Sequence, residues 1–119
     1  LSVLYKDLEG KVKTESSASI RKRIMMGREF QIKRYKEESI DFNSQLTTRM
    51  IKKYCKIGKK EKEILEDYFH NFNLSARAYH RILKVSRTIA DLDQSDKILV
   101  KHISEAIRYR SFDKKDWGS

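Results

Sequence analysis

The sequence predicts an all-α fold, a small bundle of about five helices. The 119 residues contain no proline and only four glycines, so few residues interrupt a helix. Apolar residues recur at helical spacing over most of the chain. Serine, threonine and asparagine mark the boundaries between the periodic segments, where their side chains cap helices or favour turns. The length fits a single domain.

Residues 1–15 carry a short apolar patch and then Gly10 among alternating charges, a pattern typical of an entry segment or linker. The first helix is predicted from Ser17 or Ser19 to Lys36. Its inward stripe is predicted to be Ile20, Ile24, Gly27, Gln31 and Tyr35.

Gly27 lies in the middle of this stripe, and glycine costs about 1 kcal/mol relative to alanine inside a helix. Its presence indicates that another helix or a ligand comes close, and helix packing is the simpler cause. Four large apolar residues lie off the stripe: Met25, Met26, Phe30 and Ile32. The helix therefore either packs on two sides or presents apolar surface to a partner. Its many basic residues are expected to form a solvated face.

The stretch 37–46 has no helical period and is predicted to be an irregular loop, too polar for the core. A second helix, capped by Thr47 or Thr48, is predicted to reach about Lys56. Its inward residues are Met50, Ile51, Tyr54 and Cys55.

A third helix is predicted over residues 59–72, with Ile64, Leu65, Tyr68 and Phe69 buried. A fourth follows over 75–92. A fifth ends near Arg110, with Ile103, Ala106, Ile107 and Tyr109 inward. We expect one helical domain over residues 16–111 and a flexible tail over 112–119.

The fourth helix, LSARAYHRILKVSRTIADL, divides into an apolar half and a polar half. The polar half contains Arg77, His80, Arg81, Lys84, Arg87, Thr88 and Asp91. Ser75 is the predicted N-cap, which makes Arg77 the second helical residue. A cation there is disfavoured by roughly 0.3 to 1 kcal/mol by the helix dipole. Arg77 therefore either pairs with a neighbouring carboxylate or faces an anion such as phosphate.

The balance of 27 Lys and Arg against 17 Asp and Glu gives a net charge of +10, which favours nucleic acid, a nucleotide or an acidic protein surface as partner. Cys55 is the only cysteine, so no disulfide can form within the chain, and a reducing cytoplasm is the expected compartment. No apolar run is long enough to span a bilayer. Cys55 is expected to be a core residue rather than a nucleophile.

Motifs for catalysis are missing. The histidines, His70, His80 and His102, lack metal-binding spacing, so no metal site is expected. The four glycines cannot form a GxxxxGK[ST] or GxGxxG phosphate loop. We therefore expect the chain not to act as an enzyme by itself.

One interpretation is a basic module that binds nucleic acid. Residues 59–92 have the outline of a helix-turn-helix unit, in which Arg77, His80, Arg81 and Lys84 would enter a major groove. The outline is unspecific, since any two helices with a short connection share it, and the connection NFNLS lacks the glycine common in that turn.

A second interpretation comes from a resemblance. The string LSARAYHRILKVSRTIADLDQSDKILVKHISEAIRYRS resembles the end of the magnesium-chelatase-like AAA+ ATPases of the bacterial competence (ComM) type. Upstream, ESSASIRKRIMMGREFQIKRY and FNSQL resemble the same proteins, so the likeness covers nearly the whole chain. The first residue is Leu rather than Met, and we expect a piece of a longer protein.

The resemblance implies that the chain is the C-terminal helical lid of the ATPase. Arg77 matches the sensor 2 arginine, whose implied role is to contact the γ-phosphate of ATP bound with magnesium. The implied partners are an upstream α/β module, neighbouring subunits of a hexameric ring, and DNA. Residues such as Met25, Phe30 and Ile32 would face the neighbouring subunit. Arg81, Lys84 and Arg87 are expected to remain a solvated face.

Overall fold

The computed structural model describes residues 16–112, which form five α-helices and one short 3-10 helix. The elements are α2 (Ser17–Arg34), η1 (Asn43–Gln45), α3 (Thr48–Tyr54), α4 (Lys59–Asn71), α5 (Ala76–Leu92) and α6 (Val100–Phe112). Within this range the only β-type pairing is an isolated bridge between Ile57 and Ile98. The all-α prediction is confirmed, and the helices begin and end close to their predicted limits. The expected linker over 1–15 and the tail beyond Phe112 lie outside the described residues.

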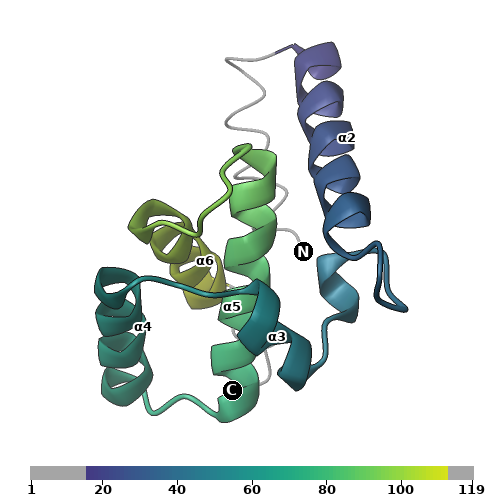
Figure 1. Cartoon of the computed structure of the whole chain (residues 1–119). Helices are drawn as coiled ribbons and strands as arrows, with labels where there is room; N and C mark the ends of the chain where they lie inside the picture. Colours follow the sequence, from purple (N-terminus) through teal and green to yellow (C-terminus); the bar gives the residue numbers. More distant parts are fainter. Residues whose placement is uncertain (1–15, 113–119) are drawn as a thin grey trace.

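The helix α5 is the centre of the bundle (Figure 1). It packs against α2 on one side and against α6 on the other, while α3 and η1 contact it between them. The helix α4 packs mainly on α6. None of the described helices has the length and apolar character needed to cross a membrane.

The core lies between α5 and its neighbours. Ala78, Ile82 and Ala90 of α5 are fully buried, together with Leu65 of α4 and Ile103 of α6. Burying one large aliphatic side chain stabilises a fold by about 1.5 to 3 kcal/mol. The predicted inward residues of α3 are also confirmed, because Met50, Ile51 and Cys55 are buried and Tyr54 packs against this core.

Side-chain caps define where three helices begin. The backbone amide of Ser19 donates to Ser16 Oγ (3.1 Å), that of Met50 to Thr47 Oγ1 (3.3 Å) and that of Ala78 to Ser75 Oγ (3.1 Å). Each bond satisfies one of the amides that a helix leaves without an internal partner. The predicted caps Thr47 and Ser75 are thereby confirmed.

Left-handed residues end α4 and α5. Asn73 (φ 49°) follows α4 and Gln94 (φ 56°) follows α5. In both turns two backbone amides donate hydrogen bonds to carbonyl oxygens of the last helical turn. The longer-range bond of each turn runs from Leu74 N to Phe69 O and from Ser95 N to Ala90 O, respectively. This is the Schellman arrangement, formed here without glycine.

Close packing of α2 on α5 explains Gly27. A Cβ at Gly27 would lie 3.5 Å from Leu92 Cδ2 and 3.6 Å from the Asp91 carbonyl oxygen. The prediction that another helix approaches Gly27 is confirmed, and the space would just accept a methyl group.

The predictions about burial are wrong for Ile24 and for the loop over residues 37–46. Ile24, placed on the inward stripe of α2, is 39% exposed, because the N-terminal part of α2, before Gly27, runs past a groove instead of a packed neighbour. The loop over 37–46 does enter the core, since Asn43 is 2% and Leu46 5% exposed. Hydrogen bonds to the Asn43 side chain remove the cost of burying it.

The off-stripe residues Met25 (62%), Phe30 (38%) and Ile32 (52%) are exposed. Within the described range α2 therefore packs on one side and presents these residues at the surface.

Candidate functional site

Arg77 occupies the first turn of α5, directly after the N-cap Ser75 and the first helical residue Ala76. Its side chain is exposed, and no carboxylate of residues 16–112 forms an ion pair with it. The first turn of α5 contains no acidic residue. A cation therefore stands at the positive end of the helix dipole without a counter-charge among the described residues.

First-turn cations elsewhere in the bundle have a carboxylate nearby. Arg49 in α3 interacts electrostatically with Glu38. The Lys101 ammonium of α6 lies 3.0 Å from Asp93 Oδ2. The first turn of α4 carries Glu61 in addition to its lysines. Among these four helix starts, only that of α5 has a cation with neither an acidic residue in its first turn nor a described carboxylate near the cation.

A groove of about 1100 Å³ runs along α5 beside Arg77, among the described residues of α2, α3, α5 and α6. Its walls combine apolar side chains, such as Ile20, Val85 and Ile89, with basic ones. The basic residues on the α5 wall are Arg77, His80, Arg81 and Lys84. The structure therefore places all four sequence-predicted residues along one groove.

These four residues differ in exposure. Arg77 is exposed, while His80, Arg81 and Lys84 are half-buried. A helix lying in a DNA major groove needs an open face, because the groove is about 12 Å wide and admits the helix itself. The helix α5 instead has neighbours on both sides (Figure 1). The packing of α5 is thus that of a central bundle helix.

The expected solvated face is wrong at Arg87, which is 4% exposed. Its guanidinium lies 3.1 Å from Asp91 Oδ1, four residues later in α5. It also donates to the carbonyl oxygens of Ser95 (2.7 Å) and Asp96 (3.0 Å), in the turn that follows α5. Arg87 therefore holds the α5–α6 turn against α5 and is unavailable to a ligand.

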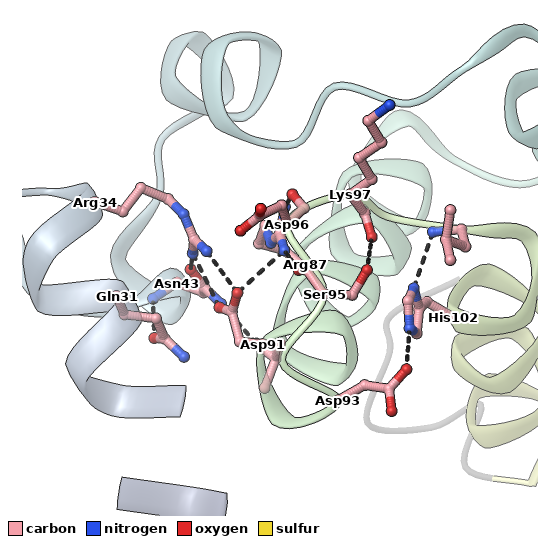
Figure 2. A network of polar contacts seen from close by, with 12 residues as sticks. Gln31, Arg34, Asn43, Arg87, Asp91, Asp93, Ser95, Asp96, Lys97 and His102 are labelled. Atoms are coloured by element: carbon pink, nitrogen blue, oxygen red, sulfur yellow. Dashed lines mark hydrogen bonds and ion pairs between the residues drawn. The ribbon is translucent and has the colours of Figure 1, made fainter. Parts of the chain in front are cut away.

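Asp91 is the centre of a buried polar network that joins α2, η1 and α5 (Figure 2). Arg34 of α2 donates to both carboxylate oxygens, at 2.5 and 2.9 Å. Asn43 Nδ2 donates to the same carboxylate at 2.9 Å. Gln31 Oε1 accepts a hydrogen bond from the backbone N–H of Asn43 (2.9 Å), and the Tyr35 hydroxyl donates to Asn43 Oδ1. The basic face expected for the first helix is therefore wrong at Arg34, which is half-buried.

In this network, burial disfavours the charged form of each arginine, and the Asp91 carboxylate favours it. For Arg34, the hydrogen bonds and charge of Asp91 outweigh burial and hold the arginine pKa above its ordinary value. For Arg87, burial dominates and lowers the pKa below its ordinary value, with repulsion from Arg34 adding to it. Burial also raises the pKa of Tyr35 to about 12. Tyr35 therefore keeps its proton near neutral pH.

A smaller network fixes the start of α6. His102 is 2% exposed; its Nδ1 accepts a hydrogen bond from the Leu99 amide (2.9 Å) and its Nε2 lies 2.9 Å from Asp93 Oδ2 (Figure 2). The hydrogen bonds from His102 and Lys101 lower the pKa of Asp93. This histidine acts as a helix cap, a role that its sequence position did not reveal.

The sequence of this helical domain is similar to those of known proteins. The family model for the C-terminal part of magnesium chelatase subunit ChlI matches residues 14–110, which includes all five helices except the end of α6. The chain belongs to this family. The resemblance seen in the sequence is confirmed.

Relatives of this magnesium chelatase C-terminal domain include two bacterial proteins. The uncharacterized protein YifB of Escherichia coli is 42% identical over 100 residues, which are 84% of this chain and 19% of YifB. The competence protein ComM of Haemophilus influenzae is 41% identical over 97 residues, which are 82% of this chain and 18% of ComM. The chain thus spans less than a fifth of the length of these relatives.

Residues 16–112 contain no cluster of three or more His, Cys, Asp or Glu side chains able to hold a metal ion. Burial raises the pKa of the Cys55 thiol to about 11, which keeps it protonated near neutrality. Cys55 is therefore a core residue, as expected.

Sequence reasoning missed the burial of four polar residues of the domain, namely Asn43, Asp91, Arg87 and His102. One local signal was present, since Arg87 and Asp91 have the i, i+4 spacing of a helix ion pair. Nothing local indicated Asn43 or Arg34, whose partners lie far along the chain.

Proposed function

We propose that this chain is the helical lid of an AAA+ ATPase and that Arg77 is its sensor 2 arginine, which contacts the γ-phosphate of ATP. The single observation that supports this role is the exposed first-turn position of Arg77 without a described carboxylate partner. ATP and its magnesium ion would be held by an α/β module elsewhere in the longer protein.

The start of α5 has the properties that phosphate recognition uses. The first intrahelical bond runs from Tyr79 N to Ser75 O, and Ser75 Oγ takes the Ala78 amide. The amides of Ala76 and Arg77 precede both bonds and point out of the helix start. Together with the Arg77 guanidinium they would meet the oxygens of a phosphate group at the positive end of the dipole.

The buried network supports a lid that moves as one piece. Arg34 and Asp91 tie α2 to the far end of α5, and Arg87 ties the following turn to the same end. A rotation of the domain would therefore carry Arg77 with it toward or away from a phosphate. A fixed guanidinium at that position stabilises charge on the transferred phosphoryl group.

We extend the proposal to the whole protein as a cytoplasmic ring of six subunits that remodels DNA. The support is the similarity to a relative named as a competence protein and the net charge of +10. The exposed residues Met25, Phe30 and Ile32 are proposed to face the neighbouring subunit.

The rival function, a helix-turn-helix module, would use α5 as recognition helix. It requires His80, Arg81 and Lys84 to reach bases together with Arg77, whereas these three side chains are half-buried along the groove. A salt-dependent shift of duplex DNA by the 119-residue chain, weakened equally by Arg77→Ala, Arg81→Ala and Lys84→Ala, would favour the rival.

ATP turnover by the full-length protein tests the sensor role. We expect Arg77→Ala to lower kcat by roughly 10²-fold, the usual effect of removing one donor to transition-state charge. Arg77→Lys should recover only part of the loss, because lysine lacks the bidentate fork. Arg49→Ala is the matched control, an arginine at the same helical position of α3 with Glu38 nearby. Unchanged turnover in Arg77→Ala would disprove the assignment.

A further inference from the structure

A ridge of six lysines follows the end of α3 and the start of α4. Its members, which we call the lysine ridge, are Lys52, Lys53, Lys56, Lys59, Lys60 and Lys62. All six side chains are exposed. Six cations within eleven residues repel one another, so the ridge favours a ligand that carries several negative charges in a row.

Most of the lysine ridge has no acidic partner in the described part of the chain. Lys53 is the exception, with its ammonium 3.5 Å from Glu38 Oε2. No carboxylate of residues 16–112 forms an ion pair with Lys52, Lys56 or Lys62. Two glutamates lie beside Lys62 in the sequence. The Glu61 side chain turns back over Gly58, at the start of α4, and Glu63 is exposed and forms no ion pair with the ridge among the described residues. The positive charge of the ridge is thus left for a partner.

The ridge borders a hollow of about 470 Å³ between α3, α4 and α5. Lys52, Lys56 and Lys62 stand around it, and its interior is formed by Ile57, Leu83 and the rings of Tyr79 and His80, among others. No acidic side chain lines it. The hollow therefore joins an apolar and aromatic interior to a rim of unpaired cations.

We propose that the lysine ridge and this hollow bind single-stranded nucleic acid. The lysines would neutralise successive phosphates of the backbone, and the hollow would receive an unpaired base against the Tyr79 and His80 rings. A duplex keeps its bases stacked and offers none to such a hollow. An acidic peptide would satisfy the lysines but gives no reason for the aromatic interior.

Two other basic surfaces fit this ligand less well. The outward cations of α2, such as Arg21, Lys22 and Arg28, stand on a convex helix among the exposed side chains of Met25 and Ile32. The basic residues of α5 that border the large groove include Arg77, which the proposed function assigns to ATP. The inferred site shares only Ile51 and His80 with that groove and does not depend on the ATPase proposal.

Fluorescence anisotropy with a labelled oligo(dT) of about 20 nucleotides, titrated with the 119-residue chain at several salt concentrations, tests the site. Replacing Lys52, Lys56 and Lys62 by glutamine should weaken binding at least tenfold. It should also reduce the slope of log affinity against log salt by about 2, since each phosphate contact on a single strand contributes about 0.7. Tyr79→Leu should weaken binding severalfold and leave the salt slope unchanged, because it removes stacking and no charge.

The matched control replaces Arg21, Lys22 and Arg28 of α2 by glutamine, which removes the same charge from exposed positions and should change affinity less than about threefold. Equal weakening by both triple variants would overturn the site and leave only an effect of net charge. A duplex of the same length that binds as tightly as the single strand would also overturn it. The oligonucleotide titration contains no ATP and the turnover assay contains no oligonucleotide, so the two tests fail independently. If Tyr79→Leu does not fold, the triple lysine variant, whose substitutions are at exposed positions, still tests whether the ridge binds the oligonucleotide.

Discussion

Arg34 Nη2 of α2 lies 2.5 Å from Asp91 Oδ1 of α5, across 57 residues of sequence. A second bond, Arg34 Nη1 to Asp91 Oδ2 (2.9 Å), makes the pair bidentate. With Arg87 at 3.1 Å and Asn43 at 2.9 Å, the buried carboxylate receives donors from both helices and from η1. These directional hydrogen bonds fix the orientation of α2 against α5, in addition to the apolar contacts between the two helices.

Removing the carboxylate should destabilise the domain strongly. Asp91→Ala leaves Arg87 buried and Arg34 half-buried without their counter-charge, and we expect a loss of about 3 kcal/mol in the free energy of unfolding. Urea denaturation followed by circular dichroism measures it. Asp41→Asn, at an exposed position, is the control and should lie within about 0.5 kcal/mol of the wild type. A loss for Asp91→Ala no larger than that of the control would show that the network does not hold the fold.

Alanine should be accepted at Gly27. The new methyl group would sit in ordinary contact with Leu92 at 3.5 Å, and the helix would gain about 0.5 to 1 kcal/mol from the better propensity of alanine. The midpoint of thermal unfolding should therefore rise by a few degrees. Gly27→Leu provides the contrast, because its larger side chain has no room between α2 and α5. Equal behaviour of the two variants would contradict the close approach of these helices.

Arg77 and Arg49 should respond differently to replacement by alanine in the isolated domain. Arg77→Ala relieves an uncompensated repulsion from the helix dipole and should raise stability by about 0.3 to 1 kcal/mol. In Arg49→Ala the same relief is offset by the lost attraction to Glu38, so the change should be smaller. Parallel urea titrations compare them at low ionic strength. A destabilised Arg77→Ala variant would mean that Arg77 has a structural partner after all.

The contribution of Asp93 to stability should depend on pH. Its pKa in the folded state is lowered below the ordinary 3.8 by His102 and Lys101. The stabilisation is therefore fully present above pH 3.8 and is lost as the pH falls through the folded-state value. Asp93→Asn should be less stable than the wild type at pH 7, and the difference should shrink below pH 3.8. Asp67→Asn, at an exposed position on α4, is the control and should lie within about 0.5 kcal/mol of the wild type at pH 7.

Cys55 should be unreactive while the domain is folded. With a pKa of about 11, roughly one thiol in a thousand is ionised at pH 8, and the residue is also only 3% exposed. Labelling by a disulfide reagent should therefore be slow in buffer and rapid in denaturant. Fast labelling of the native protein would contradict both the burial and the raised pKa.

Much of the helical framework was predictable because it depends on local chemistry. The caps Thr47 and Ser75 and the apolar stripe of α5 are encoded within a few residues of the structures they form. The prediction for Ile24 failed because the pattern of one helix does not say how far its neighbour extends.

The same division applies to the candidate site. Helix periodicity and the cap Ser75 by themselves determined the all-α class and the place of Arg77 in the first turn of α5. Only the tertiary structure decided that Arg87 and Asp91 are buried, that Asn43 enters the core, and that Lys52, Lys56 and Lys62 surround one hollow. The reason is physical: a charged side chain can be buried only where a partner compensates for lost hydration, and here the partners come from helices distant in sequence.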